Sequence, residues 1–549
     1  MNKILQGIKI EKIGYGGIGL ARMSDGKRIL IKGGALPGDI VDLKIVKQKK
    51  DHIQAHIINI KKSNLEISNG QIFCPHFFSL SHINQDTKNL LPIKDYSSFP
   101  NKIGCGGCKW QVVSHENQLK LKQEIVADAF KKLKNKILDF NFFPIIGTGV
   151  EKGYRNKIEF SFGKFISHDT TYSDWSLGFH KQGEFSKIID IDSCGLISSQ
   201  ANEIFQHIKN LCFKSKLPVY DQKTHQGFFR HLVIRQGINT GQFLVNLSVS
   251  DDNLKKNLIT KRNSFLEKLK KDEYLKKNVT TFVITYNNGL ADTINSPQSQ
   301  TKTFRGDGYI YETLKFQISK QNNFNANLDT NLNDNGNINS NGNLENNSDF
   351  LTSLDNANLK QIDVNFRVAP FSFFQTNTLG AQLLFSESMK IVGNVQGLIF
   401  DLYCGTGSIG LSFLKVGKGE KLIGIEISQD AIIDAQYNSK INGLEEKSIF
   451  ITGASEKALI QNPTLRDKLK DIGLVIIDPP RDGLHKNVIT LLSELKKESD
   501  FKLLYISCNP ITMARDIELL SGQGFQLKLL QPVDMFPQTH HIEVIGLLQ

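Results

Sequence analysis

A cysteine at the end of an apolar run offers the clearest chemistry in this sequence. Residues 503–508 read Leu-Leu-Tyr-Ile-Ser-Cys, and Asn509 and Pro510 follow. The apolar run predicts a buried strand, and Pro510 suits the first turn of a following helix. Cys508 would then lie at the carboxyl end of a strand, where open α/β sheets bind ligands. It could act as a thiolate nucleophile, or it could be a small buried side chain that closes the strand.

A glycine-rich turn has the composition of a cofactor loop. A predicted strand ends at Asp401, and Gly405 and Gly407 lead from it into a helix. The next strand carries Glu426 about 20 residues later, a position from which a carboxylate can hold ribose hydroxyls. The spacing differs from the G-x-G-x-x-G dinucleotide fingerprint and resembles the S-adenosylmethionine site of class I methyltransferases. The alternative is an ordinary glycine turn with a surface acid.

Four other cysteines could form a metal site. Cys105 and Cys108 are separated by two glycines, the spacing that lets two thiolates bind one metal ion or cluster. Cys74 and Cys194 complete a set of four. On spacing alone, zinc, an iron–sulfur cluster and a redox-active pair all remain open.

Two acidic residues are candidates for the same site. The strand over residues 473–478 ends at Asp478, and the prolines after it stiffen a loop that contains Arg481. Glu543 follows His540 and His541 on the last predicted strand. By residue type, His540, His541 and Glu543 could each serve as a base. The plain alternative for Glu543 is a charge on an edge strand.

Three differently built regions must position these residues. Residues 1–62 alternate short apolar runs with glycine turns, which predicts an OB-like β-barrel. Residues 63–362 contain a helical pattern over 114–136 and many strands, which predicts an α+β domain. Residues 363–549 alternate strands with helices, which implies a parallel sheet with crossover helices. The fold class is therefore multidomain α/β.

Two details of the middle region bear on function. The strands over 153–162 and 229–235 are expected to turn Arg or Lys side chains outward, toward phosphates or solvent. Residues 321–360 contain 15 Asn and no Lys or Arg before Lys360. This composition predicts a disordered insertion without catalytic residues.

Composition limits the class of protein. The chain has 549 residues, 40% of them hydrophobic, and a net charge of +12 that is compatible with a polyanionic partner. The Lys-rich stretches at residues 47–50, 61–62, 131–136 and 268–277 could equally be solvated faces. No apolar run is long enough for a membrane span, and the N-terminus lacks the apolar core of a signal peptide. We expect a cytoplasmic protein with reduced cysteines and no membrane partner.

Taken together, these motifs resemble the RNA 5-methyluridine methyltransferases, in particular the iron–sulfur enzymes that act on 23S rRNA. The resemblance covers nearly the whole chain except residues 80–103 and 321–360. Its start resembles the RNA-binding TRAM domain. The motifs that carry it are the glycine run 14–20, the four cysteines, Phe373-Phe-Gln-Thr-Asn377, Asp401-Leu-Tyr-Cys-Gly-Thr-Gly407, Asp478-Pro-Pro-Arg-Asp-Gly483, Ser507-Cys-Asn-Pro510 and His541-Ile-Glu543.

The resemblance implies a role for each matching residue. Cys508 would be the nucleophile that attacks C6 of uracil, and Glu543 the base that removes the C5 proton. Phe373 would stack near the target uracil. The residues that would contact S-adenosylmethionine are Gln375, Tyr403, Ser408, Glu426 and Asp478. The ligands of a [4Fe–4S] cluster, with zinc as the alternative, would be Cys74, Cys105, Cys108 and Cys194.

Some residues depart from the family's pattern. The family has five residues between its first two cluster cysteines, whereas 30 separate Cys74 from Cys105 here. An insertion that loops out, over residues 80–103, would preserve the geometry. Ser408 stands where relatives often have Asn. Cys404 is expected to be structural, and Cys212 matches no role.

The resemblance predicts an S-adenosylmethionine-dependent enzyme, a monomer, that methylates C5 of a uridine in 23S rRNA through a Cys508 adduct. One alternative is the same chemistry on the T-loop uridine of tRNA. Another is a non-catalytic RNA-binding or ribosome-assembly factor. The TRAM-like start and the four cysteines favour rRNA, because the tRNA enzymes of this family commonly lack both.

Overall fold

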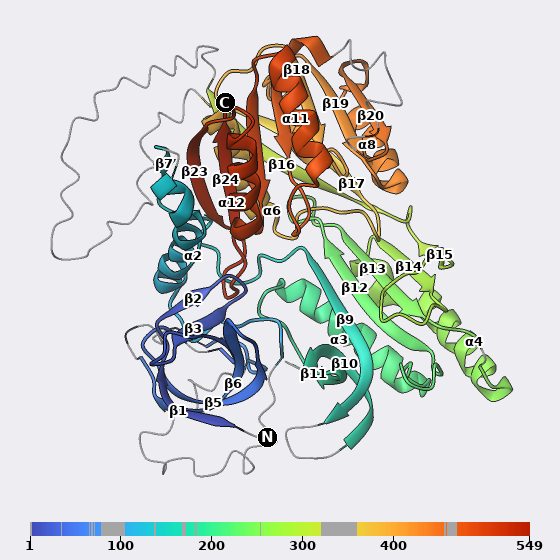
Figure 1. Ribbon diagram of the computed structural model, residues 1–549. Coiled ribbons are helices and arrows are strands. Elements are labelled where there is room, and N and C mark those ends of the chain that lie inside the picture. The colour runs from blue at the N-terminus through green and yellow to red at the C-terminus, as the bar shows by residue number, and fades with distance from the viewer. Residues whose placement is uncertain are drawn as a thin grey trace.

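In the computed structural model, the described residues form four β-sheets, and helices pack around the two largest (Figure 1). It describes residues 3–34, 36–64, 66, 70, 72–77, 105–136, 139–166, 172–181, 184–252, 254–319, 359–454, 457 and 469–549. The insertion expected over 80–103 and nearly all of the Asn-rich segment lie outside these ranges. Among the described helices, none is both long and apolar enough to cross a membrane.

The N-terminal region folds as a six-stranded sheet that curls on itself (Figure 1). Its order is β1-β5-β6-β4-β3-β2, and all neighbours are antiparallel except β4 and β6. Alternate residues such as Ile29, Ile31 and Val41 point inward and form a separate small core. The strands are β1 (Ile4–Lys9), β2 (Lys12–Gly14), β3 (Ile18–Arg22), β4 (Arg28–Lys32), β5 (Ile40–Gln48) and β6 (His52–Lys62).

The central region is built on a seven-stranded sheet in the order β11-β10-β9-β12-β13-β14-β15. Its apolar residues pack with α3 and α4 into a core of their own. The strands are β9 (Lys157–Ile166), β10 (Tyr172–Lys181), β11 (Glu184–Asp190), β12 (Phe229–Gln236), β13 (Phe243–Val249), β14 (Thr281–Tyr286) and β15 (Gln300–Arg305). The helices are α3 (Ser199–Ser215), α4 (Lys256–Lys271) and α5 (Glu273–Asn278).

The prediction that β12 turns arginines outward is wrong. Arg230 and Arg235 are only 2% and 3% exposed. The Arg230 guanidinium donates to the carbonyls of Asn287, Gly289 and Ala291, and Arg235 donates to the carbonyl of Ser372 at 2.6 Å. Both side chains are therefore buried and donate to backbone carbonyls inside the protein instead of facing phosphates or solvent.

The C-terminal region contains a sheet whose first five strands are parallel, in the order β20-β19-β18-β21-β22. The antiparallel strands β24 and β23 extend it. The strands are β18 (Leu398–Leu402), β19 (Lys421–Glu426), β20 (Ser448–Thr452), β21 (Ile472–Ile477), β22 (Lys502–Ser507), β23 (Leu527–Asp534) and β24 (Glu543–Leu548). The strand order reverses between β18 and β21, which is where open α/β sheets bind ligands.

Helices cover both faces of this sheet. Successive strand residues feed opposite cores: Phe400 joins the core with α2, α11 and α12, and Ile399 joins the core with α6, α7 and α8. Strands that are buried on both faces have continuous apolar sequences, and these runs predict the strands of this sheet. The helices are α6 (Thr378–Val392), α7 (Ser408–Lys415), α8 (Gln429–Ile441), α11 (Lys486–Glu498) and α12 (Pro510–Ser521), with short 3₁₀ turns at Glu445–Lys447 and Leu469–Asp471.

The packing differs from the predicted division after residue 362. Helix α2 (His115–Lys136) contacts α12, and β7 (Asn141–Phe142) and β8 (Ile146–Gly147) pair with β23. Buried residues of α2 such as Val126 and Phe130 belong to the C-terminal core. The position of this segment in the chain predicts that it belongs to the central domain, but its apolar face is buried against the C-terminal sheet.

A two-stranded sheet joins residues on either side of the Asn-rich segment. β16 (Ile310–Ser319) pairs antiparallel with β17 (Leu359–Val368) along its whole length. Strand β17 therefore starts at Leu359, inside the predicted insertion and before the predicted boundary. Phe316 and Phe366 are buried in the same core as α6 and α7, and this burial fixes the strand.

Candidate active site

Cys508 lies between a buried strand and a helix, as its sequence context predicts. Strand β22 ends at Ser507, and α12 begins at Pro510. Asn509 caps the helix: its Oδ1 accepts a hydrogen bond from the Ile511 backbone N–H at 3.1 Å. Its Nδ2 donates to the carbonyl of Arg481 at 2.9 Å. The cap therefore fixes the turn that presents the thiol and ties it to the loop after β21.

Acidic groups and one cation surround the thiol. Burial, together with the nearby Glu543 and Asp478, raises the pKa of Cys508 to about 11. Arg481 opposes this rise in the Cys508 pKa, as a positive charge and as a hydrogen-bond donor. Burial also raises the pKa of Asp478 to about 7. The structure thus brings Cys508, Glu543 and Asp478 together, and it adds Arg481.

Arg481 was not among the predicted site residues. Its signal was its position directly after the two prolines that follow Asp478. A stiff loop at the carboxyl edge of the sheet directs that side chain to the same edge as Cys508.

The three candidate bases differ in their proton affinity. Burial, together with nearby cationic groups, lowers the pKa of His540 to about 3. The same causes lower the pKa of His541 to about 4. Glu543 is 7% exposed, and burial together with Asp478 raises its pKa well above the ordinary value. Of the three, only Glu543 is therefore suited to accept and hold a proton at neutral pH.

The glycine turn after β18 is held by carboxylates. The buried Asp401 accepts a hydrogen bond from the Gly410 N–H at 3.1 Å. Glu426 accepts from the Gly405 N–H at 3.2 Å and from the Ser428 N–H at 3.0 Å. Burial raises the pKa of Asp401 to about 8, and Asp478 and Glu426 contribute to the rise. These carboxylates are therefore neighbours at the carboxyl ends of β18, β19 and β21.

The backbone of this turn is unusual. Tyr403 has a φ of 63°, and Gly405 and Gly407 have φ values of 54° and 77°. A positive φ is uncommon for a residue other than glycine and marks a functional or strained turn. Ser408 is the first residue of α7 and is buried. Cys404 is also buried in the core, in agreement with a structural role.

The segment from Phe373 to Asn377 links the glycine turn to the loop between β23 and β24. The carbonyl of Phe373 accepts from Thr406 at 3.2 Å, and the Asn377 Nδ2 donates to the carbonyl of Met535 at 2.7 Å. The carbonyl of Gln375 accepts from Asn156 at 2.9 Å. The Phe373 ring is nevertheless 59% exposed, so it is free to contact another molecule.

The four predicted ligand cysteines line one small cavity of about 40 Å³. Cys74 lies there despite its long separation from Cys105 in the sequence. Burial raises the pKa of Cys105, Cys108 and Cys194, and the Cys105 Sγ accepts from the Gly107 N–H at 3.3 Å. In the described part of the chain, however, no group of three or more His, Cys, Asp or Glu residues is arranged to hold a metal ion. Cys212 is a core residue of the central domain.

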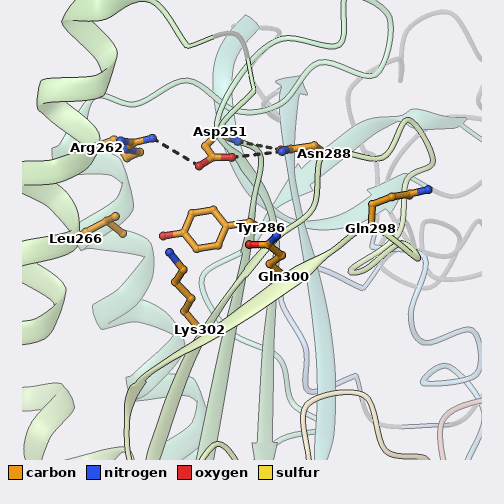
Figure 2. Close-up of a pocket in the computed structure, with 8 residues that line it drawn as sticks. All are labelled: Asp251, Arg262, Leu266, Tyr286, Asn288, Gln298, Gln300 and Lys302. Carbon is orange, nitrogen blue, oxygen red and sulfur yellow. Dashed lines mark hydrogen bonds and ion pairs between the residues drawn. The ribbon is translucent and has the colours of Figure 1, made fainter. Parts of the chain in front are cut away.

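A second hollow, of about 300 Å³, lies between α4 and the edge of the central sheet (Figure 2). Asp251 there lies between Arg262 and Asn288, and Lys302 lies 5.4 Å from the centre of the Tyr286 ring. None of the predicted site residues lines it.

Comparison with known proteins finds RNA methyltransferases. A sequence model of the tRNA (uracil-5-)-methyltransferase family matches residues 258–549. An uncharacterised RNA methyltransferase of Clostridium acetobutylicum is 30% identical over 98% of this chain and 96% of its own length. A second, from Caldanaerobacter subterraneus subsp. tengcongensis, is 29% identical over 99% of this chain and 98% of its own.

One solved structure has a similar fold over the whole chain. It is a tRNA (uracil-54, C5)-methyltransferase of Pyrococcus abyssi in complex with S-adenosyl-L-homocysteine. The TM-score is 0.61, the sequence identity is 20%, and the match covers 99% of this chain and all of the other. At this identity the likeness is one of fold.

Proposed function

The chain belongs to the tRNA (uracil-5-)-methyltransferase family of S-adenosylmethionine-dependent RNA methyltransferases, and we propose that it methylates C5 of a uridine in 23S rRNA. One observation carries the proposal: Cys508, Glu543, Asp478 and Arg481 meet at the carboxyl edge of the C-terminal sheet. A partly exposed thiol beside a buried carboxyl is the pair that uracil-C5 methylation needs.

The chemistry assigns one step to each residue. Because C5 of uracil is a poor nucleophile, the Cys508 thiolate first adds to C6, and the electrons of the C5–C6 double bond move to form an enolate. When bound, S-adenosylmethionine supplies an electrophilic methyl group to C5. Glu543 then removes the C5 proton, the double bond re-forms, and the Cys508–C6 bond breaks.

The surroundings explain how these residues can act. Arg481 favours the thiolate form of Cys508, against the burial that disfavours it. The raised pKa of Glu543 makes it a strong proton acceptor once it is ionised. Gln375, Tyr403, Ser408, Glu426 and Asp478 are proposed to hold S-adenosylmethionine around the glycine turn. The exposed ring of Phe373 is proposed to stack on the target uracil, which must leave its base stack to enter.

The choice of 23S rRNA rests on the family resemblance, through the N-terminal barrel and the four cysteines. Methylation of a tRNA uridine is the second candidate, because the similar archaeal structure is named for uridine 54 of tRNA and matches this chain from end to end. Mapping 5-methyluridine in rRNA and tRNA from a deletion strain separates the two. Loss of the modification from tRNA alone would overturn the rRNA proposal, and turnover by a Cys508→Ala protein would overturn the mechanism.

We also propose that Cys74, Cys105, Cys108 and Cys194 hold a [4Fe–4S] cluster, with zinc as the alternative. Four thiols around one cavity are the donor set that either group requires. Protein purified anaerobically should be brown and contain iron, and Cys74→Ala should lose that iron. A colourless protein with stoichiometric zinc would contradict the cluster.

A further inference from the structure

The hairpin β2–β3 of the N-terminal barrel reaches the loop that leads to Glu543 (Figure 1). Gly17, at the tip of this hairpin, has a φ of 69°. A Cβ placed on Gly17 would lie only 3.3 Å from Cβ of His540. This is tighter than ordinary van der Waals contact, so the tip lies directly against the loop between β23 and β24.

The hairpin is anchored next to this contact. Lys12 in β2 forms an ion pair with Asp128 of α2 at 2.5 Å. Ile13 is buried and packs, together with the partly buried Tyr15, into a cluster that includes Trp110. The Lys109 and Trp110 N–H groups in turn donate to the carbonyl of Gln538, both at 3.1 Å, within the same loop. The ion pair of Lys12 and the packing around Trp110 therefore hold the hairpin, and with it Tyr15, in place.

The phenol of Tyr15 lies within the electrostatic reach of the groups that the mechanism uses. Burial raises the pKa of Tyr15, and the charges of Cys508 and Glu543 raise it further, while Arg481 lowers it. A tyrosine with a raised pKa keeps its proton at neutral pH and remains a hydrogen-bond donor. Its ring packs against the cluster that contains Trp110, and its phenol is close enough to Cys508 and Glu543 to interact with their charges.

From this placement we propose that Tyr15 is a residue of the active site, whose hydroxyl donates a hydrogen bond to a carbonyl oxygen of the target uracil. Addition of Cys508 to C6 moves negative charge onto that oxygen, and a fixed neutral donor stabilises such charge. The N-terminal barrel then completes the active site in addition to any contact it makes with RNA elsewhere. This inference rests on the proposed uridine substrate.

The test compares Tyr15→Phe, which removes only the hydroxyl, with the wild-type full-length protein. We expect the rate of 5-methyluridine formation on rRNA transcripts to fall on the order of 10- to 100-fold, the effect of losing one hydrogen bond to a charged group. The affinity for S-adenosyl-L-homocysteine and the melting temperature should not change. Tyr274→Phe is the matched control, because that hydroxyl has no hydrogen-bond partner among the described residues and lies on α5 of the central domain.

Gly17→Val is the second perturbation. Its side chain would meet His540, and its φ is unfavourable for a residue other than glycine, so the hairpin tip should move away and lower the rate in the same way. A Tyr15→Phe protein as fast as the wild type would overturn the inference, even if Tyr15→Ala were slow, because the ring would then only pack. If the wild type itself forms no 5-methyluridine in any RNA, the proposed function fails, and this inference fails with it.

Discussion

Replacing Lys122 with Ala should strongly destabilise the C-terminal half of the protein. Lys122 on α2 and Asp534 at the end of β23 have fully buried side chains, and their charged atoms are 2.6 Å apart. Lys122 also donates to the carbonyl of Phe536 at 3.1 Å, where the loop to Glu543 begins. The Nε2 atom of His115 also lies 3.1 Å from the Asp534 carboxylate.

The magnitude follows from burial. Removing one partner of a buried ion pair leaves an uncompensated charge and costs about 3–5 kcal/mol of unfolding free energy. Lys120, on the same helix, forms an ion pair with Glu116 at the same distance of 2.6 Å, but its side chain is 50% exposed. Lys120→Ala should therefore cost only about 0.3–0.5 kcal/mol. The Lys120–Glu116 ion pair is a matched control for Lys122–Asp534, because the two ion pairs have the same length and differ in burial.

Guanidinium-induced unfolding, followed by tryptophan fluorescence, measures the free energies of unfolding of the two variants. Trp110 is buried, and the Lys122 ammonium lies 5.9 Å from its ring centre, so one of the two tryptophans reports on this site directly. A double variant, Lys122→Met with Asp534→Asn, removes both charges and should recover much of the loss. The reasoning is refuted if Lys122→Ala is no more destabilising than Lys120→Ala.

The pair should also give a pH signature. Burial alone would raise the pKa of Asp534, but Lys122 and His115 hold it below its ordinary value. Stabilisation from a depressed carboxyl pKa is present above the unfolded-state pKa and is lost as pH falls through the folded-state pKa. The difference between Lys122→Ala and the wild type should therefore shrink in acid.

Three further predictions concern the active site. Glu426→Ala should weaken the binding of S-adenosyl-L-homocysteine about 10- to 100-fold, as measured by calorimetry. Glu420→Ala, at an exposed position, should leave this affinity unchanged, and equal affinities of the two variants would exclude Glu426 as a ligand. Asn509→Ala should lower the free energy of unfolding by about 1 kcal/mol and slow turnover, because it removes the α12 cap and the bond to Arg481; an unchanged melting curve would contradict this. Since the pKa values of Cys508 and Glu543 are both raised and both must ionise, kcat/KM should rise with pH from about 6 to 9; a flat profile would argue against these roles.

Local features of the fold were predictable from the sequence. The strand, turn and helix around Cys508 follow from an apolar run, an Asn cap and a proline at the first helical position. The same holds for the glycine turn, whose positive φ values require glycine at Gly405 and Gly407. In each case a few adjacent residues carry the whole signal.

Features that depend on distant contacts were not predictable. The sequence predicts that the arginines of β12 face outward, yet segments far away in the chain bury Arg230 and Arg235. Helix α2 packs on the C-terminal sheet although it precedes the central one. Tyr15 and Glu543 lie at opposite ends of the sequence, and only the completed fold brings them together.

Capture of Cys508 on RNA tests the central claim most directly. In an rRNA transcript that carries 5-fluorouridine, fluorine replaces the proton that Glu543 must remove, so the reaction should stop at the covalent stage. With S-adenosylmethionine, the wild type should form a protein–RNA conjugate that survives denaturing electrophoresis, and mass spectrometry should place the nucleotide on Cys508. A conjugate on another residue, or one that persists in Cys508→Ala, would contradict the account.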